Sequence, residues 1–148
     1  MRKYLIIGLV ALMGFLTSCE TKNVCYFNKK TVDLVVKSAD WKFDKELNQF
    51  YVHFNVPAIT AEVYNYGEFS VHREYSNNKN EKWQVALPQS LYLSEEVTTE
   101  EGTTTVYYQQ LVDYRIGIGY AEIQVTNSDF YYEGYTPEDM LFRLQLTY

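Results

Sequence analysis

Glycine, proline and cysteine are all scarce in this chain. Its 148 residues include only seven Gly, three Pro and two Cys. So few glycines and prolines exclude collagen-like and low-complexity architectures, and the length fits one globular domain. Acidic residues outnumber basic residues by 19 to 13, and the net charge is −6. This charge argues against a nucleic-acid partner, because binding nucleic acid requires a basic face that replaces counterions.

Aromatic residues, in contrast, are abundant. They make up 17% of the chain, and fifteen of them are tyrosines. Aromatic side chains fit the pleated, half-buried surface of a sheet, so this composition favours strands. Apolar and polar residues alternate with period two, most clearly at 140–148. The strands predicted from alternation and turn signals are 31–37, 50–56, 68–75, 82–87, 91–98, 104–112, 114–120, 121–126 and 140–148.

These strands define the expected fold class. Antiparallel sheets with one buried face produce such alternation, and a single sheet cannot bury its apolar face alone. We therefore predict an all-β domain over 31–148. Its architecture is expected to be an antiparallel two-sheet Greek-key β-sandwich, with a small β-barrel as the alternative.

Turn and helix signals separate some of the strands. One helical turn is expected at 60–64, with Thr60 as its N-cap. Gly67 is expected to supply a positive φ at the following turn. Residues 100–102 are predicted to form the tip of a hairpin. The Gly-Ile-Gly sequence at 117–119 is interpreted as a bulge or a close backbone approach.

The N-terminus has the features of an export signal. Residues 2–3 are basic, and 5–16 contain no charged or polar side chain. This run is shorter than the roughly 20 apolar residues that a transmembrane helix needs, so it indicates a secretory signal. The next residues, Leu16-Thr17-Ser18-Cys19, resemble the bacterial lipobox, in which signal peptidase II cleaves before a lipidated cysteine.

This resemblance implies a lipoprotein signal peptide at 1–18. It also implies a lipidated Cys19 and a short tether over 19–30. Several acyl chains then hold the protein stably on the membrane. The alternative is an ordinary cleaved signal with an incidental cysteine. Lipidation of Cys19 leaves Cys25 without a disulfide partner in the chain, either as a harmless thiol or as a site for an intermolecular bridge.

Four short motifs follow along the mature chain. In order they are Asp40-Trp41 with Val56-Pro57-Ala58-Ile59-Thr60, then Val63-Tyr64 with Gly67, then Leu87-Pro88, and finally Pro137 with Met140-Leu141-Phe142-Arg143. Together they resemble a group of small outer-membrane lipoproteins of Bacteroidota. The resemblance covers most of the mature domain and implies a lipid-anchored β-sandwich in a Gram-negative outer membrane. The resemblance implies no activity, and it assigns no functional residue to this chain.

The sequence contains no recognisable catalytic or metal-binding pattern. A Gly-x-Ser-x-Gly motif is absent, and no His or Cys spacing suggests zinc. His53 and His72 are expected on solvated faces or a second sheet face. The acidic residues around the predicted hairpin tip are interpreted as protection of an edge strand. We therefore expect no enzyme, no metal site and no cofactor.

The candidate binding residues are aromatic. Tyr131, Tyr132 and Tyr135 fall in a segment between the last two predicted strands, where alternation stops. With Trp41 and Trp83 they could stack on a glycan or contact a peptide, because such rings combine contact area with a polar group. The structural alternative is that the tryptophans belong to the core or its rim and the tyrosines cover an open end of the sandwich.

Two functions remain as hypotheses from these residues. The first is a lipid-anchored outer-membrane binding module or accessory subunit of an envelope complex, with an outer-membrane protein as partner. The second is a surface lipoprotein that binds a glycan or peptide through exposed aromatics. Only Glu20 is acidic directly after Cys19, so the sequence leaves open whether the domain faces the periplasm or the cell surface.

Overall fold

The computed structural model describes residues 28–100, 102–128 and 135–148 of the chain. Its elements are β1 (Lys29–Val36), the 3-10 turn η1 (Ser38–Asp40), β2 (Lys42–Asp44), β3 (Gln49–Asn55), α2 (Ala61–Tyr66), β4 (Glu68–Ser76), β5 (Lys82–Ala86), β6 (Gln89–Thr99), β7 (Gly102–Gly117), β8 (Tyr120–Asn127) and β9 (Met140–Thr147). The predicted signal peptide, Cys19, Cys25, Tyr131 and Tyr132 lie outside the described residues.

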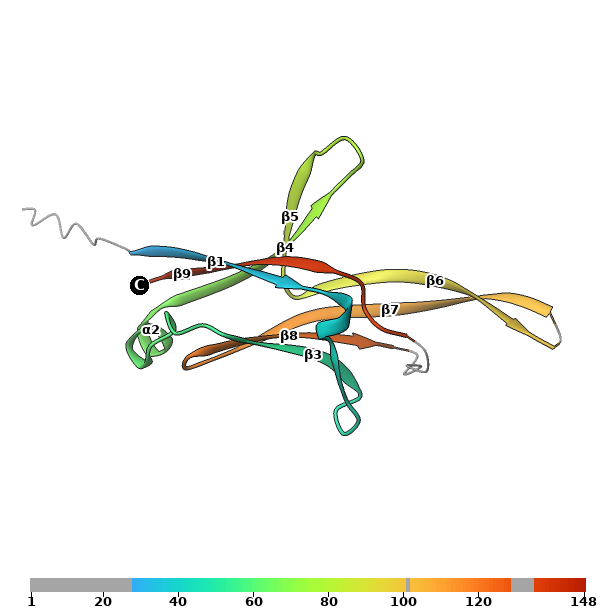
Figure 1. Cartoon of the computed structure of the whole chain (residues 1–148), viewed down its shortest axis with the longest axis horizontal. Coiled ribbons are helices and arrows are strands. Elements are labelled where there is room, and N and C mark those ends of the chain that lie inside the picture. Colours follow the sequence, from blue (N-terminus) through green and yellow to red (C-terminus); the bar gives the residue numbers. More distant parts are fainter. Residues whose placement is uncertain (1–27, 101, 129–134) are drawn as a thin grey trace, which may run out of the picture.

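Two antiparallel sheets pack face to face as a β-sandwich (Figure 1). One sheet has the strand order β1-β9-β4-β5, and the other has the order β2-β3-β8-β7-β6. Neighbours such as β1 and β9 are far apart in the sequence, as the connections of a Greek key require. The predicted sandwich is confirmed, and the barrel alternative is wrong because each sheet keeps two edge strands.

The core lies between the inner strands of the two sheets. In β8 and β9 every second residue is buried, as the period-two pattern predicts. Ile123 and Val125 of β8 and Phe142 and Leu144 of β9 are fully buried. Strands at the centre of a sheet have neighbours on both sides, so their inward side chains lose the most contact with water.

The helical turn forms where it was predicted. The Thr60 hydroxyl accepts a hydrogen bond of 3.2 Å from the backbone N–H of Val63, which confirms Thr60 as the N-cap of α2. The prediction for Gly67 is wrong, because its φ is −86°. Glycine is needed here for space. A Cβ at this position would lie 2.5 Å from the carbonyl oxygen of Val63 and 3.1 Å from that of Thr147.

The Gly-Ile-Gly sequence forms a hairpin turn. Gly117 and Tyr120 are paired, so Ile118 and Gly119 connect β7 to β8, and Gly119 has a φ of 82°. The bulge interpretation is therefore wrong, and β7 is one strand where two were predicted. The close approach is made at Gly117, where a Cβ would lie 2.2 Å from the ring of Tyr120.

The longest strands, β6 and β7, continue beyond the sandwich. The neighbouring strand β8 pairs with β7 only from Gln110 onward. Among the described residues, 92–99 and 102–109 therefore pair only with each other. We call these two segments the ribbon. β6 ends at Thr99, which pairs with Gly102 at the start of β7, so the two strands form a hairpin where one was predicted.

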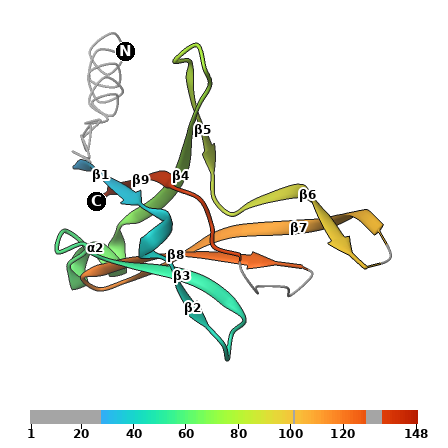
Figure 2. The same cartoon turned by 45° about the vertical axis from the view of Figure 1, so that its right-hand side comes forward.

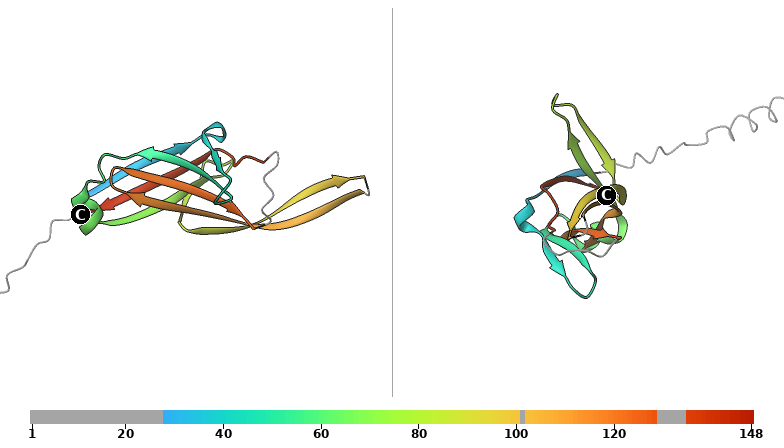
Figure 3. Two further views of the ribbon diagram at one scale, coloured as in Figure 1. Left: turned by 90° about the horizontal axis from the view of Figure 1, so that it is seen from below. Right: turned by 90° about the vertical axis from the view of Figure 1, so that its right-hand side faces the viewer.

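The ribbon extends from the end of the sandwich opposite the start of β1 and the C-terminus (Figure 3). At the other end, the start of β1 lies beside the C-terminus, and Asn28 and Tyr148 exchange two backbone hydrogen bonds of 2.7 and 3.0 Å. The β4–β5 and β2–β3 hairpins project in other directions (Figure 2). The described fold is therefore a two-sheet body with one long extension.

Candidate functional site

Two surfaces meet at the base of the ribbon, one on each of its faces. Side chains alternate between the faces of a strand, so Tyr92 and Tyr107 point outward while Leu93 and Tyr108 point inward. The outward surface is an aromatic hollow, and the inward surface lines a cavity between the two sheets; Leu93 and Tyr108 contribute to both. We call them the outer hollow and the inner cavity.

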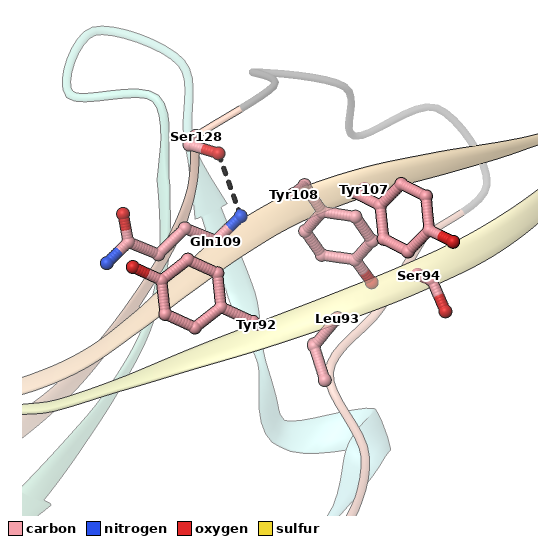
Figure 4. Close-up of a pocket in the computed structure, with 7 residues that line it drawn as sticks. All are labelled: Tyr92, Leu93, Ser94, Tyr107, Tyr108, Gln109 and Ser128. Atoms are coloured by element: carbon pink, nitrogen blue, oxygen red, sulfur yellow. Dashed lines mark hydrogen bonds between the residues drawn. The ribbon is translucent and has the colours of Figure 1, made fainter.

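The outer hollow has two strongly exposed tyrosines at its rim. Tyr92 is 86% exposed and Tyr107 is 80% exposed, and the hollow between them has a volume of about 480 Å³ (Figure 4). Gln109 joins it to the sandwich, because its backbone N–H donates to the hydroxyl of Ser128 at 2.9 Å and its side chain donates to Ser90. The exposed tyrosine rings offer apolar area with a hydroxyl at the edge.

The inner cavity has a volume of about 460 Å³. It lies between β4 on one sheet, β6 and β7 on the other, and the segment that leads into β9. Its lining residues are Arg73, Tyr75, Leu91, Leu93, Tyr108, Gln110, Tyr135, Thr136, Glu138 and Met140. This combination of apolar walls and a few polar groups is typical of ligand sites.

Arg73 is the cationic group of the inner cavity. It follows Val71 on the inward face of β4, and its side chain is only 6% exposed. Its Nη2 donates to Oε1 of Glu138 at 2.7 Å, and its guanidinium carbon lies 4.6 Å from the ring centroid of Tyr75. A buried cation needs a paired anion, and the carboxylate of Glu138 supplies it although that side chain is 75% exposed.

Two further polar side chains, Gln110 and Tyr135, line the cavity. Nε2 of the buried Gln110 donates to the hydroxyl of Tyr135 at 2.7 Å and to Oδ1 of Asn127 at 3.2 Å. The ring of Tyr135 packs edge-on against Phe50, with centroids 5.7 Å apart. Burial raises the pKa of Tyr135, so its phenol stays protonated at neutral pH. This wall offers fixed hydrogen-bonding groups to a bound molecule.

The structure separates the aromatic residues that were predicted to bind ligand. Trp41 is 8% exposed and its Nε1 donates to the carbonyl of Glu138 at 3.2 Å, so it is a core residue, as the structural alternative held. Trp83 is 47% exposed and stacks on Tyr75, with centroids 5.6 Å apart. Tyr135 lines the inner cavity. Tyr131 and Tyr132 lie outside the described residues.

Sequence reasoning missed the most informative members of the site. Arg73 occupies an inward position of β4, where alternation calls for an apolar residue. That interruption of the pattern was a usable signal. Tyr92 and Tyr107 gave no comparable signal, because their exposure depends on where β8 stops pairing with β7.

The histidines do not form a metal site with other ligands. His53 stacks on Tyr120 at 4.8 Å, and its Nδ1 lies 3.8 Å from a carboxylate oxygen of Glu122. Nδ1 of His72 is buried without a hydrogen-bond partner. In the part of the chain that the structure describes, no group of three or more His, Cys, Asp or Glu side chains could hold a metal ion.

The surface ion pairs are mostly between neighbouring strands. Arg143 of β9, for example, pairs with an acid of β1, because its Nε lies 2.9 Å from Oδ1 of Asp33. None of the described helices is long and apolar enough to span a bilayer.

Comparison with family models, with curated proteins and with solved structures finds no match to this chain. The architecture defines a two-sheet β-sandwich, and its function has to be argued from the ribbon and the two surfaces at its base.

Proposed function

We propose that this chain is a lipid-anchored outer-membrane protein that binds a protein partner through its ribbon, as an accessory subunit of an envelope complex. The ribbon carries the proposal. An isolated pair of strands is at best marginally stable in water, yet 92–99 and 102–109 extend without a third strand among the described residues. A partner that covers the ribbon would stabilise it.

The side chains of the ribbon support a protein partner. Tyr92 and Tyr107 project into solvent, and tyrosine is enriched where proteins contact one another. The outer edge of β6 is unpaired over its described length, so an extended segment of a partner could add to the sheet there.

The charge of this region indicates the kind of partner. Residues 83–114 contain no Lys or Arg, whereas Glu95, Glu96 and Glu100 lie near the tip of the ribbon. A basic surface would complement this acidic tip and would speed the encounter. We therefore expect the partner to present basic residues to the ribbon.

The placement of the ribbon fits an anchored protein. The tether enters the fold at β1, at the end opposite the ribbon (Figure 3). If Cys19 carries the lipid, the ribbon lies at the end of the domain farther from the point of attachment. A docking surface in that position is accessible to other envelope proteins.

The test is a pull-down from native membranes of the full chain with a C-terminal tag, extracted in mild detergent and followed by mass spectrometry. The double variant Tyr92→Ser/Tyr107→Ser is compared with Tyr66→Ser. Tyr66 is 84% exposed at the end of α2, away from the ribbon, so its variant is a matched control.

We expect one partner to copurify in stoichiometric amount with the wild-type chain and with Tyr66→Ser. Capture should fall by about tenfold or more with the double variant, because a tyrosine that acts as an interface hot spot contributes about 2 kcal/mol or more. A chain that copurifies with nothing, or a partner retained equally by the double variant, would contradict the proposal.

The outer hollow favours one second candidate, a glycan- or peptide-binding protein. Two exposed tyrosines bound a space of about 480 Å³, which could hold a sugar ring. Screening the full chain against glycan and peptide arrays tests this candidate. The candidate function requires a ligand that binds the wild-type chain and Tyr66→Ser but does not bind Tyr92→Ser/Tyr107→Ser.

A further inference from the structure

We infer that the inner cavity binds a carboxylate carried on an apolar or aromatic body, with Arg73 as its anchor and Glu138 as an internal competitor. This inference does not depend on the proposed function, because it rests on Arg73 and Glu138, which line the inner cavity and not the outer hollow. Two sources share this chemistry: a free apolar carboxylic acid and the C-terminus of a peptide that ends in an apolar residue.

The guanidinium of Arg73 keeps donors for such a ligand. A guanidinium has five N–H groups in a rigid fork that matches a carboxylate. Among the described residues, the hydrogen bond of this guanidinium is the one from Nη2 to Glu138. The ring of Tyr75 covers one face of the group and fixes its orientation toward the cavity. An incoming carboxylate can therefore pair with Arg73 without rearrangement of β4.

Glu138 is suited to exchange with that carboxylate. It precedes β9 in a segment that is not part of a strand, and its side chain is 75% exposed. When it leaves Arg73, water can solvate it fully. Arg73 has no such alternative, because its side chain is 6% exposed. The exchange replaces one carboxylate with another at the buried cation, so it leaves no buried charge unpaired.

The remaining walls select the body of the ligand. Leu91, Leu93 and Met140 provide apolar surface, and Tyr108 adds an aromatic ring. The volume of about 460 Å³ falls within the range of small-molecule sites. A phenyl or branched aliphatic group joined to the carboxylate would fill this space and bury apolar area.

Methionine provides a reporter placed inside the cavity. The chain has three methionines, Met1, Met13 and Met140, and only Met140 lies in the described fold, where it is 5% exposed. Full-length protein with ¹³C-labelled methionine methyl groups is studied by NMR in mild detergent. The signal of Met140 is assigned by its loss in Met140→Leu.

The probes are 3-phenylpropionate and the dipeptide N-acetyl-Ala-Phe with a free carboxylate, each compared with its amide. We expect a saturable shift of the Met140 signal with the acid forms and none with the amides. Binding of phenylpropionate indicates a free acid as ligand. Binding of the dipeptide acid alone indicates a peptide C-terminus. Equal binding of the amides, or no shift with any acid, would overturn the inference.

Variants test the two residues separately. Arg73→Met should weaken binding of the acids by about tenfold to a hundredfold, because it removes charge-assisted hydrogen bonds. Glu138→Gln should tighten binding several-fold, because the internal competitor is gone. Arg115→Met is the matched control, since this arginine lies on β7 with a side chain 56% exposed.

Folding of each variant is checked by the dispersion of its ¹H–¹⁵N spectrum. If Arg73→Met were to misfold, the affinity of Glu138→Gln alone would test the inference. If Glu138 only supported the structure of the site, its loss would weaken binding, whereas loss of a competitor strengthens it. A folded Arg73→Met with unchanged affinity, or a Glu138→Gln that binds more weakly, would refute the assignment.

Discussion

Arg73 and Glu138 form one ion pair, but replacing one residue should lower the free energy of unfolding by a very different amount from replacing the other. The side chain of Arg73 is 6% exposed, and that of Glu138 is 75% exposed. Removal of the carboxylate leaves a buried guanidinium without its anion. Removal of the guanidinium leaves a carboxylate that water already surrounds.

The magnitudes follow from this asymmetry. Glu138→Ala should lower the free energy of unfolding by about 1–3 kcal/mol, the cost of a buried polar group that loses its partner. Arg73→Met should cost less than about 1 kcal/mol, because methionine of similar length can pack on Tyr75 and no buried charge remains. In the Arg73→Met background, Glu138→Ala should add less than about 0.5 kcal/mol.

Urea unfolding of the four proteins measures this cycle. The buried Trp41 provides the fluorescence signal, and Tm from circular dichroism gives an independent ranking. Equal costs of the two single variants would refute the reasoning, and so would a cost of Glu138→Ala that persists in the Arg73→Met background. Either result would mean that burial of the cation does not determine the energy of the pair.

Three more predictions test other parts of the molecule. Gly67→Ala should lower the free energy of unfolding by about 1–3 kcal/mol, seen as a lower Tm, because its Cβ would meet two backbone oxygens that cannot move aside. The hydrogen bond from Lys37, and next the one from the Ser38 N–H, hold the pKa of the Asp139 carboxyl below its ordinary value of 3.8. Its stabilisation is present above pH 3.8 and is lost as pH falls through the lowered pKa, so the Tm difference between wild type and Asp139→Asn should vanish in acid. Cys19→Ser should abolish incorporation of labelled palmitate and move the protein out of the outer-membrane fraction, as immunoblots of fractionated cells would show.

The fold was predictable where one face of a strand is buried. The alternation in β9 places Phe142 and Leu144 inward in both the sequence pattern and the structure. The hairpin turn at 118–119 was not predictable in the same way. Residues 114–120 are apolar or aromatic enough to continue a strand, and only the pairing of Gly117 with Tyr120 ends it there. The need for glycine at position 67 likewise depends on a tertiary contact, because the carbonyl oxygen of Thr147 occupies part of the space that a Cβ would need.

The candidate site was predictable only in part. Tyr135 was named from sequence and lines the inner cavity, whereas Trp41 was named and belongs to the core. The break in alternation at Arg73 marked an unusual inward position, but only the packing of the opposite sheet shows that this side chain is buried. The ribbon arises from unequal strand lengths in one sheet, and local sequence patterns contain no information about where a neighbouring strand stops.

The pairing of β1 with β9 has a mechanical consequence for a tethered protein. Among the described residues, β1 is an edge strand that pairs only with β9, through eight residue pairs from Lys29↔Thr147 to Val36↔Met140. Tension between a membrane tether at Lys29 and a load on the ribbon at the far end would run roughly along this strand. Antiparallel hydrogen bonds lie perpendicular to the strands, so such tension shears all the pairs together and does not open them one by one. If Cys19 carries the lipid, a pulling force on the tether therefore meets the combined resistance of all the β1–β9 pairs.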